Sequence, residues 1–374
     1  MECQALRAAG YQVSVVCPKA PGDPTYQELD GVHLYKYRAF PPITRQAMFI
    51  FEYLYSILAT FLGLVKAYRR APFGTVQVCN PPDVLWAPVF PLMLLLRVRL
   101  VYDQHDLCPE LYLSRFDSSR PVVLRLLLLV ERITYRLATH VIVTNESYRA
   151  IAMSRGRKTA DEVTIVRTGP DPDRLRAVEP DPALRRGFEY LLVYIGVMGP
   201  QDGVDIAVRA MHHIVDVVGR TDVGLTLIGD GDVAADLRRL SHELGLANYV
   251  HFTGRAPDEL VARLMSTAHI GLSPDPKNPL NDVSTMNKTM EYMAFELPVV
   301  AFDLVETRVS AAEAAQYAEP NEVADYANTV IWLLDDDVRR KQMGEFGRRR
   351  VCDVLAWQHQ TGAYVGVYND LTGR

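Results

Sequence analysis

The chain has 374 residues, of which 49% are hydrophobic and 23% are charged, and its formal net charge is −5. This length accommodates two domains with cores of their own, and the composition excludes wholesale disorder. A net negative charge gives no reason to expect a nucleic-acid partner. The five cysteines are scattered without metal-ligand spacing, which predicts reduced thiols in a cytoplasmic protein. Residues 1–18 lack the basic and apolar regions of a signal peptide.

The first half of the sequence alternates predicted helices and strands. Residues 3–9 predict a helix that Gly10 ends. Predicted strands follow at residues 13–17, 75–79, 98–103, 140–144 and 163–166. Further helices are predicted over residues 83–96, where Pro88 and Pro91 are expected to disturb the helix, and over residues 122–137 and 145–155. Such alternation predicts a parallel sheet with right-handed crossovers.

The longest apolar stretch is AMFIFEYLYSILATFLGLVKAYRR, residues 47–70. It nearly has the length of a membrane span, and the basic residues at its end resemble interface anchors. Glu52 and several tyrosines dilute its apolar character, so a buried or partly membrane-facing helix is favoured over a span. Arg45 before it and the basic cluster after it are predicted to hold the first domain on an anionic inner leaflet, near a lipid-linked acceptor.

The second half repeats the alternation after a segment rich in Pro and Asp, residues 167–182, which predicts a linker. Predicted strands cover residues 190–196, 224–228, 249–253 and 270–273. Predicted helices cover residues 204–218, 234–244 and 257–266, and only helices are expected after Asn321.

The stretch NDVSTMNKTMEYMAFELPVVAFD, residues 281–303, predicts a polar loop, a short helix over residues 288–295 and a buried strand over residues 298–302. Such a loop aims backbone N–H groups and a helix N-terminus at one point, which suits a phosphate. Lys288 and Glu291 share a helix face, so the lysine can pair with a phosphate while the glutamate accepts hydrogen bonds from a ribose. The alternative is an ion pair on a solvated helix.

The pattern K-x-x-E-Y-M-A followed by P-V-V-A resembles the donor-nucleotide site of the retaining glycosyltransferases of family 4. Other stretches resemble that family in the same order: DQHDLCPELY (103–112), YIGVMGPQDGVD (194–205), LIGDGD (227–232) and VHFTGR (250–255). The resemblance implies an α/β protein of the GT-B fold, with two Rossmann-like parallel-sheet domains facing a cleft.

The same resemblance divides the chain into four parts. Residues 1–168 correspond to the N-terminal, acceptor-side domain, and residues 169–185 to the linker. Residues 186–355 correspond to the nucleotide-sugar-binding domain, and residues 356–374 to a helix that crosses back to the first domain.

The predicted site residues follow from the motifs and from the resemblance. The catalytic group is predicted to comprise His105, Lys288 and Glu291, with Asp106 setting the tautomer of the histidine. A histidine in a loop after a strand has the alternative of a structural or merely exposed role. The predicted donor-binding residues are Gly196, Gly199, Gly229, Arg255, Ser284, Thr285, Met286, Asn287, Lys288 and Glu291.

The sequence departs from the family pattern at several places. Val283 stands where a first glutamate is usual, although Asp282 is adjacent, and Val197 and Asp202 stand where an arginine and a lysine neutralise the diphosphate. The family's first strand and glycine-rich turn are missing, which predicts either a late start or an impaired protein. Bacterial members with the form S-T-M-x-K-x-x-E-Y-M-A share the other departures, which indicates a subtype.

The function that the resemblance implies is a cytoplasmic hexosyl- or N-acetylhexosaminyltransferase, peripheral at the inner membrane face. It would move a sugar with retention from a nucleotide-diphosphate donor, UDP being favoured over GDP, to a glycan or lipid-linked acceptor in cell-surface polysaccharide synthesis. No metal and no other cofactor is expected, since no D-x-D follows a strand near the nucleotide. The alternatives are a nucleotide-sugar 2-epimerase of the same fold and a catalytically impaired nucleotide-binding paralogue. A nicotinamide-dependent oxidoreductase is disfavoured because neither domain opens with G-x-G-x-x-G.

Overall fold

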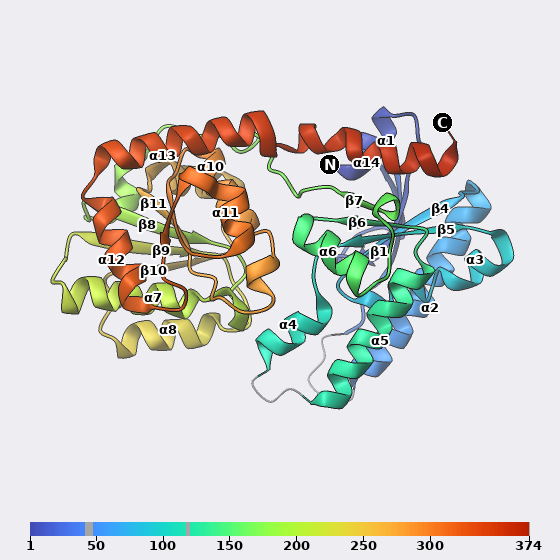
Figure 1. Cartoon of the computed structure of the whole chain (residues 1–374), viewed down its shortest axis with the longest axis horizontal. Helices are drawn as coiled ribbons and strands as arrows, with labels where there is room; N and C mark the ends of the chain where they lie inside the picture. The colour runs from blue at the N-terminus through green and yellow to red at the C-terminus, as the bar shows by residue number, and fades with distance from the viewer. Residues whose placement is uncertain (42–47, 117–119, 374) are drawn as a thin grey trace. The chain divides into compact units, whose positions relative to one another are not determined.

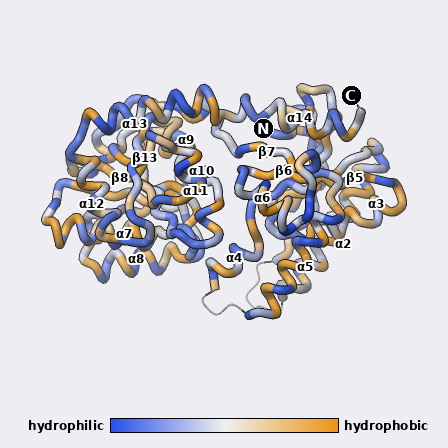
Figure 2. Tube along the Cα trace, in the orientation of Figure 1, coloured by the Kyte–Doolittle hydropathy of each residue, from blue (hydrophilic) through white to orange (hydrophobic). Residues whose placement is uncertain are grey.

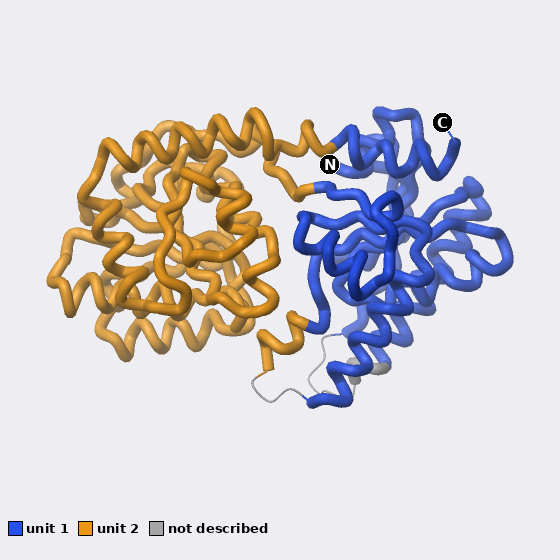
Figure 3. The backbone as a smooth tube through the Cα atoms, viewed as in Figure 1, with its two compact units in different colours: residues 1–109, 120–166, 361–374 blue, residues 110–119, 167–360 orange. Residues whose placement is uncertain are grey.

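The computed structural model describes residues 1–41, 48–116 and 120–373. Two compact units divide the chain (Figure 3). Unit 1 comprises residues 1–109, 120–166 and 361–374, and unit 2 comprises residues 110–119 and 167–360. Arg45, predicted to precede a membrane-facing helix, lies outside the described residues.

Unit 1 has two separate sheets in its described part (Figure 1). In one sheet, β1 (Ser14–Lys19) pairs in parallel with β3 (Val32–Arg38), which also pairs antiparallel with β2 (Tyr26–Leu29). The other sheet has four parallel strands: β4 (Thr75–Cys79), β5 (Arg99–Gln104), β6 (His140–Val143) and β7 (Val163–Ile165). β5 and β6 are almost entirely buried, as expected of parallel strands covered on both faces.

The helices of the first half are α1 (Glu2–Ala8), α2 (Met48–Arg70), α3 (Phe90–Leu96), α4 (Cys108–Arg115), α5 (Pro121–Leu137) and α6 (Glu146–Ser154). The single helix predicted over residues 83–96 is wrong, because a 3₁₀ turn covers Asp83–Trp86 and α3 begins only at Phe90. Pro88 and Pro91 lack the backbone N–H that a continuous helix needs. The sequence patterns also missed β2 and β3.

Unit 2 is built on one sheet of six parallel strands in the order β10-β9-β8-β11-β12-β13. Its strands are β8 (Tyr190–Ile195), β9 (Val223–Ile228), β10 (Val250–Gly254), β11 (Ile270–Ser273), β12 (Val299–Phe302) and β13 (Ala315–Ala318). β9, β11 and β12 are buried along their whole length. The short strand β13 was not predicted.

Helices cover both faces of this sheet (Figure 1). One buried apolar cluster holds α7 (Val204–His212), α8 (Ala234–Glu243) and α12 (Val323–Leu334) against one face. A second cluster holds α9 (Asp258–Thr267), α10 (Asn287–Ala294) and α11 (Val305–Ala311) against the other. A single π-helical turn, His213–Val217, extends α7 over the range that was predicted as one helix.

The C-terminal residues form α13 (Asp337–Arg350) and α14 (Trp357–Thr372). Trp357, at the start of α14, donates its backbone N–H to Pro170 O at 3.1 Å within unit 2. Further along α14, the Tyr364 hydroxyl donates to Gln77 Oε1 at 2.7 Å within unit 1. No helix in the described ranges combines the length and the apolar character that a membrane crossing requires.

Tyr292 fixes α10 to the sheet of unit 2. Its hydroxyl accepts a hydrogen bond from Ile195 N at 3.0 Å and donates one to Leu272 O at 2.9 Å. Its ring fills the space beside Gly271, where an added Cβ would lie 2.4 Å from a ring carbon. The tyrosine of the K-x-x-E-Y pattern therefore positions the helix that carries Lys288 and Glu291 relative to β8 and β11.

Candidate active site

The parallel strands of unit 2 bring several loops to one edge of the sheet. Gly196 follows β8, Gly229 follows β9, Arg255 follows β10 and Asp275 lies two residues after β11. Because these strands are parallel, their carboxyl ends lie at the same edge, where open α/β sheets bind ligands. The structure therefore gathers the predicted donor residues of these loops at one edge.

Two of the predicted glycines are required by close approach of the backbone. Gly229 has φ of 131°, and a Cβ there would lie 2.0 Å from Gly196 O. Gly196 has φ of 150° and donates its N–H to Ile228 O at 3.1 Å. A Cβ at Gly196 would also lie 3.6 Å from Lys288 Cε, so the lysine side chain passes beside this loop. Gly229 thus lets its loop pack against the loop at Gly196, and the Lys288 side chain lies beside that second loop.

Lys288 is held by an acidic partner that the sequence patterns did not identify. Its Nζ lies 2.5 Å from Asp275 Oδ1, and the two side chains are 10% and 1% exposed. Ser273 Oγ donates to the other oxygen of Asp275 at 2.7 Å. Burial opposes the charged form of Lys288, but Asp275 and Asp202 outweigh it, so the pKa of Lys288 is raised. The lysine therefore stays cationic although it is almost buried.

Asp202 is the second carboxylate near this lysine. Its Oδ2 accepts the Gly199 N–H at 2.9 Å, so the aspartate also closes the turn that begins at Gly199. Burial raises the pKa of Asp202; Lys288 opposes the shift and Asp275 adds to it. The position where the family carries a lysine is thus occupied by an acid that faces the cation of α10.

Glu291 and the loop before α10 complete the predicted donor set. Burial raises the pKa of Glu291, and Lys288 opposes that shift. The Ser284 N–H donates to Asn281 O at 3.3 Å, so this N–H is already engaged, and Asn287 is exposed as the first residue of α10. Arg255 is exposed after β10, and Thr285 and Met286 are half-buried in the loop.

In unit 1, His105 follows β5 and pairs with a buried carboxylate. Its Nε2 lies 3.0 Å from Asp103 Oδ2, and the side chains are 31% and 2% exposed. This hydrogen bond raises the pKa of His105, although burial opposes the shift. We predicted that Asp106 sets the tautomer of the ring; the carboxylate hydrogen-bonded to the ring nitrogen is that of Asp103.

Asn80, which follows β4, holds the backbone of the His105 loop. Its Oδ1 accepts the N–H groups of His105 at 2.7 Å and Asp106 at 3.1 Å, and its Nδ2 donates to Asp106 O at 2.6 Å. Asp83 Oδ1 accepts from the same Nδ2 at 2.8 Å and from the Tyr102 hydroxyl at 2.6 Å. Because these polar groups are buried, the loop has one well-defined position.

One group of side chains in the described residues has the composition of a metal site. The ligand atoms of Cys79, Asp103 and His105 lie within 4.8 Å of one another. Burial of the sulfur, followed by the nearby carboxylates, raises the pKa of the Cys79 thiol, so this group favours a proton on sulfur unless a cation displaces it. A thiol, an imidazole and a carboxylate are a donor set that suits Zn²⁺.

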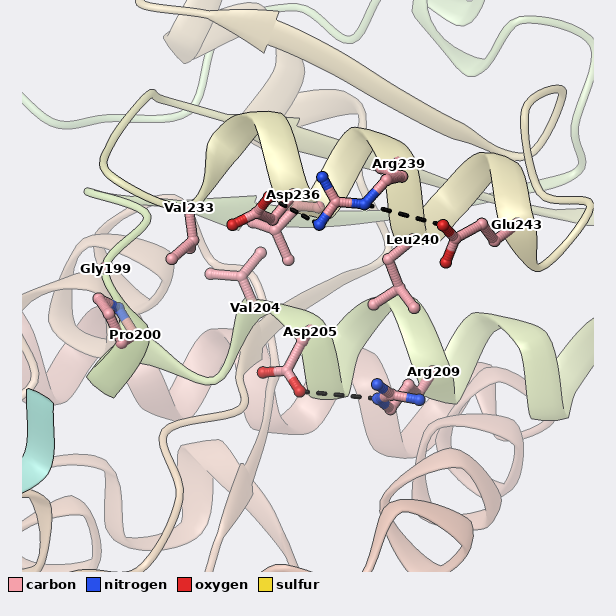
Figure 4. A pocket seen from close by; sticks show the side chains of 11 residues that line it. Gly199, Pro200, Val204, Asp205, Arg209, Val233, Asp236, Arg239, Leu240 and Glu243 are labelled. Atoms are coloured by element: carbon pink, nitrogen blue, oxygen red, sulfur yellow. Dashed lines mark ion pairs between the residues drawn. The ribbon is translucent and has the colours of Figure 1, made fainter. Parts of the chain in front are cut away.

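A groove of about 420 Å³ runs between α7 and α8 (Figure 4). Its charged side chains pair with one another: Arg209 lies 3.6 Å from Asp205, and Arg239 lies 2.8 Å from Asp236 and 3.7 Å from Glu243. Of the predicted donor residues, Gly199 lines this groove, whereas Lys288 and Glu291 do not. The groove is therefore distinct from the site around Lys288.

Solved structures of known proteins share the fold of this chain. The sucrose-phosphate synthase of Thermosynechococcus elongatus superposes with a TM-score of 0.81 at 20% identity, covering 100% of this chain and 92% of that one. HepE of Anabaena, solved in complex with UDP-glucose, has a TM-score of 0.70 at 15% identity, with 96% of this chain and 99% of that one covered. With its two parallel-sheet α/β units, the chain has the GT-B fold.

Family models cover both halves of the sequence. Residues 2–174 match the model described as Glycosyltransferase Family 4, and residues 189–336 match the model described as Glycosyl transferases group 1. The chain is therefore a glycosyltransferase, as the sequence motifs predicted.

Two curated relatives carry glycosyltransferase names. The 2-deoxystreptamine glucosyltransferase of Streptomyces kanamyceticus is 25% identical over 329 residues, 85% of this chain and 83% of that protein. The GDP-mannose-dependent alpha-(1-6)-phosphatidylinositol monomannoside mannosyltransferase of Mycobacterium tuberculosis is 28% identical over 235 residues, 59% of each chain. The chain thus resembles enzymes that transfer different sugars.

The Asp103→Asn substitution is expected to lower the pKa of His105, because it removes the charge that stabilises the imidazolium. An NMR titration of the His105 ring measures this pKa, with the exposed-site substitution Asp173→Asn as control. Because the pKa of His105 is raised in the folded state, the His105–Asp103 pair stabilises the fold fully below a pH of about 6.5. This stabilisation is lost as the pH rises through the raised pKa. An equal His105 pKa in both variants would contradict the role given to Asp103.

Proposed function

We propose that this glycosyltransferase moves a hexosyl or N-acetylhexosaminyl group from a UDP-sugar to a glycan or lipid-linked acceptor with retention. The observation that carries the proposal is the position of Lys288 and Glu291 on α10, at the edge where the loops after β8 and β11 end. A cation and a carboxylate one helical turn apart fit the diphosphate and the ribose of one nucleotide.

Lys288 stabilises the negative charge that develops on the leaving diphosphate in this proposal. Asn287 and Lys288 open α10, so their N–H groups have no acceptor one helical turn before them, and the positive end of the helix favours an anion. Glu291 accepts hydrogen bonds from the ribose hydroxyls. Transfer needs no metal ion in this scheme, because these groups supply the positive charge.

The choice of UDP over GDP rests on how much of this chain is covered by two similar proteins, one solved with UDP-glucose and one named for GDP-mannose. The HepE neighbour with UDP-glucose spans 96% of this chain, whereas the mannosyltransferase named as GDP-mannose-dependent aligns with 59% of it. Arg255, exposed after β10, is placed in the proposal beside the base. Binding measurements with both nucleotides separate the two choices.

His105 contacts the transferred sugar or the acceptor hydroxyl in this proposal. The ring of His105 is partly exposed, whereas Asp103 and Asn80 beside it are buried. The histidine is therefore held in position while part of its ring stays accessible. The raised pKa keeps part of the imidazole protonated near neutral pH, which suits hydrogen-bond donation to a sugar oxygen. We place the enzyme in the cytoplasm at the inner membrane face, in cell-surface polysaccharide synthesis.

The S-T-M-x-K-x-x-E-Y-M-A subtype accounts for the weak positive charge of the proposed site. Val197, which is 64% exposed, and Asp202 stand where the resemblance implies an arginine and a lysine.

The substitution Lys288→Ala is expected to abolish the rise in melting temperature that UDP causes in the wild-type chain. Loss of a charged hydrogen bond to phosphate costs about 1.5–3 kcal/mol, which is roughly a 10- to 150-fold loss of affinity. Lys341→Ala, whose side chain is 80% exposed in unit 2, is the matched control. Lys288→Arg should retain part of the UDP shift, which separates loss of charge from loss of folding.

The thermal-shift comparison also includes GDP and ADP. If GDP gives a larger shift than UDP, the donor nucleotide is GDP and the proposed position of the donor site is unchanged. A wild-type chain that responds to none of the three nucleotides, or an equal UDP response in Lys288→Ala, would contradict the proposed donor site.

The substitution Asp202→Asn is expected to strengthen UDP binding, because it removes a carboxylate that competes with the diphosphate for Lys288. Wild-type affinity should rise as the pH falls through the raised pKa of Asp202, since protonation removes the same charge. Isothermal titration at several pH values measures both effects. The protonation of UDP itself cancels in the difference between the two chains.

Asp205→Asn is the control for this comparison, because Asp205 is half exposed and pairs with Arg209 in the groove between α7 and α8. Equal affinity and equal pH dependence in the wild type and Asp202→Asn would show that Asp202 does not face the bound nucleotide.

A further inference from the structure

We propose that the exposed face of α5 in unit 1 docks on the anionic surface of a lipid bilayer. This inference rests on the proposed function and extends it, because an enzyme that uses a lipid-linked acceptor must be held at the membrane. The observations that carry it concern α5 itself and stand apart from the donor site in unit 2.

The exposed face of α5 carries an apolar stripe. Val122, Leu126 and Leu129 are 75%, 57% and 54% exposed, and their spacing of four and three residues places them on one side of the helix. The helix also has a buried side, which holds Thr134 and Tyr135. An amphipathic helix of a globular protein normally turns its apolar stripe toward the core, so a second apolar stripe on the solvent side needs another partner.

A row of arginines runs along the same face. Arg125, Arg132 and Arg136 are exposed, and with the three apolar residues they occupy an arc of about 120° at 100° per residue. The acidic residue of α5, Glu131, is fully buried and pairs with Arg155 Nε at 2.7 Å. The exposed face of α5 therefore carries positive charge only, in a chain whose formal net charge is −5.

The longest helix of unit 1, α2, repeats this arrangement in its described side chains. Phe51, Leu54, Leu58 and Leu62 are 50–64% exposed and follow a helical spacing. Figure 2 shows hydrophobic residues along both α2 and α5. Lys66, Arg69 and Arg70, all exposed, follow in the last turns of α2. Two helices of the same unit thus combine exposed apolar side chains with exposed cations.

The charge of the α5 face decides between the partners that would cover it. A second copy of the chain would bring the same arginines against each other in a twofold interface, and such like-charge contacts are unfavourable. A bilayer surface offers lipid phosphates to the arginines and an acyl boundary to the leucines. Arginine stems can lie along apolar surface while their guanidinium groups stay at the headgroups.

The experiment is co-sedimentation of the full chain with vesicles of phosphatidylcholine, with and without phosphatidylglycerol. The wild type is expected to bind the vesicles that contain phosphatidylglycerol and to bind phosphatidylcholine alone weakly. Substitution of Arg125 and Arg132 by Gln should lower the partition coefficient about fivefold for each charge removed. Substitution of Val122, Leu126 and Leu129 by Gln should abolish binding to both kinds of vesicle.

The matched control changes an exposed apolar residue and its neighbouring arginine in unit 2, by Val338→Gln and Arg339→Gln. This control is expected to bind vesicles like the wild type. The UDP thermal shift of every variant is measured in parallel, because it reports folding and the donor site without any membrane. An α5 variant that loses vesicle binding but keeps the UDP shift therefore supports the docking face, even if no sugar transfer is detected.

Three results would overturn the proposal. The wild type could fail to bind anionic vesicles, or the α5 variants could bind as well as the control. The wild type could also be a dimer in solution that the α5 variants convert to a monomer, which would assign the face to a second copy. A failure of the donor site would appear as a missing UDP shift with vesicle binding intact.

Discussion

The site in unit 2 depends on one nearly buried cation. Lys288 would lose most of its hydration where it lies, and an isolated ammonium group there would be costly. Asp275 offsets that cost, and Ser273 holds Asp275 in turn, while Tyr292 ties the helix of Lys288 to two strands. The cation is thus fixed by neighbouring side chains and by the sheet, and in the proposed function the helix that carries it would not have to move to meet a diphosphate.

The same principle organises unit 1. His105 follows a strand whose last residues include a buried acid, Asp103, and Asn80 after the neighbouring strand fixes the backbone around the histidine. In both units a basic side chain pairs with a buried acid near the carboxyl end of a parallel strand. The apolar strands explain why these acids stay fixed, since a buried carboxylate with satisfied partners has few alternative positions.

Much of this architecture could be predicted from the sequence, because parallel strands and their helices leave strong periodic patterns. The strand after α10 and the placement of Lys288 and Glu291 on one helix follow from the order of polar and apolar residues.

The partners of the site residues could not be predicted in the same way. Asp275 and Lys288 are 13 positions apart and Asn80 and His105 are 25 apart, so their contacts depend on loop geometry. Asp106 was expected beside His105 because it is adjacent in sequence, whereas residues two apart on a strand end point to the same side, which favours Asp103. Pro88 and Pro91 are expected from the sequence to disturb a helix over residues 83–96, but the sequence pattern does not show that a 3₁₀ turn and a separate helix replace it.

The proposed function requires this glycosyltransferase to use a UDP-sugar and to retain the anomeric configuration. The most direct measurement is NMR of the reaction with UDP-sugars labelled with ¹³C at the anomeric carbon, including glucose, galactose and N-acetylglucosamine, together with a mixture of glycan and lipid-linked acceptors. One donor is expected to yield a product whose anomeric one-bond coupling shows the configuration of the donor. A product of opposite configuration, a free epimerised sugar without transfer, or no turnover of any UDP-sugar would contradict it.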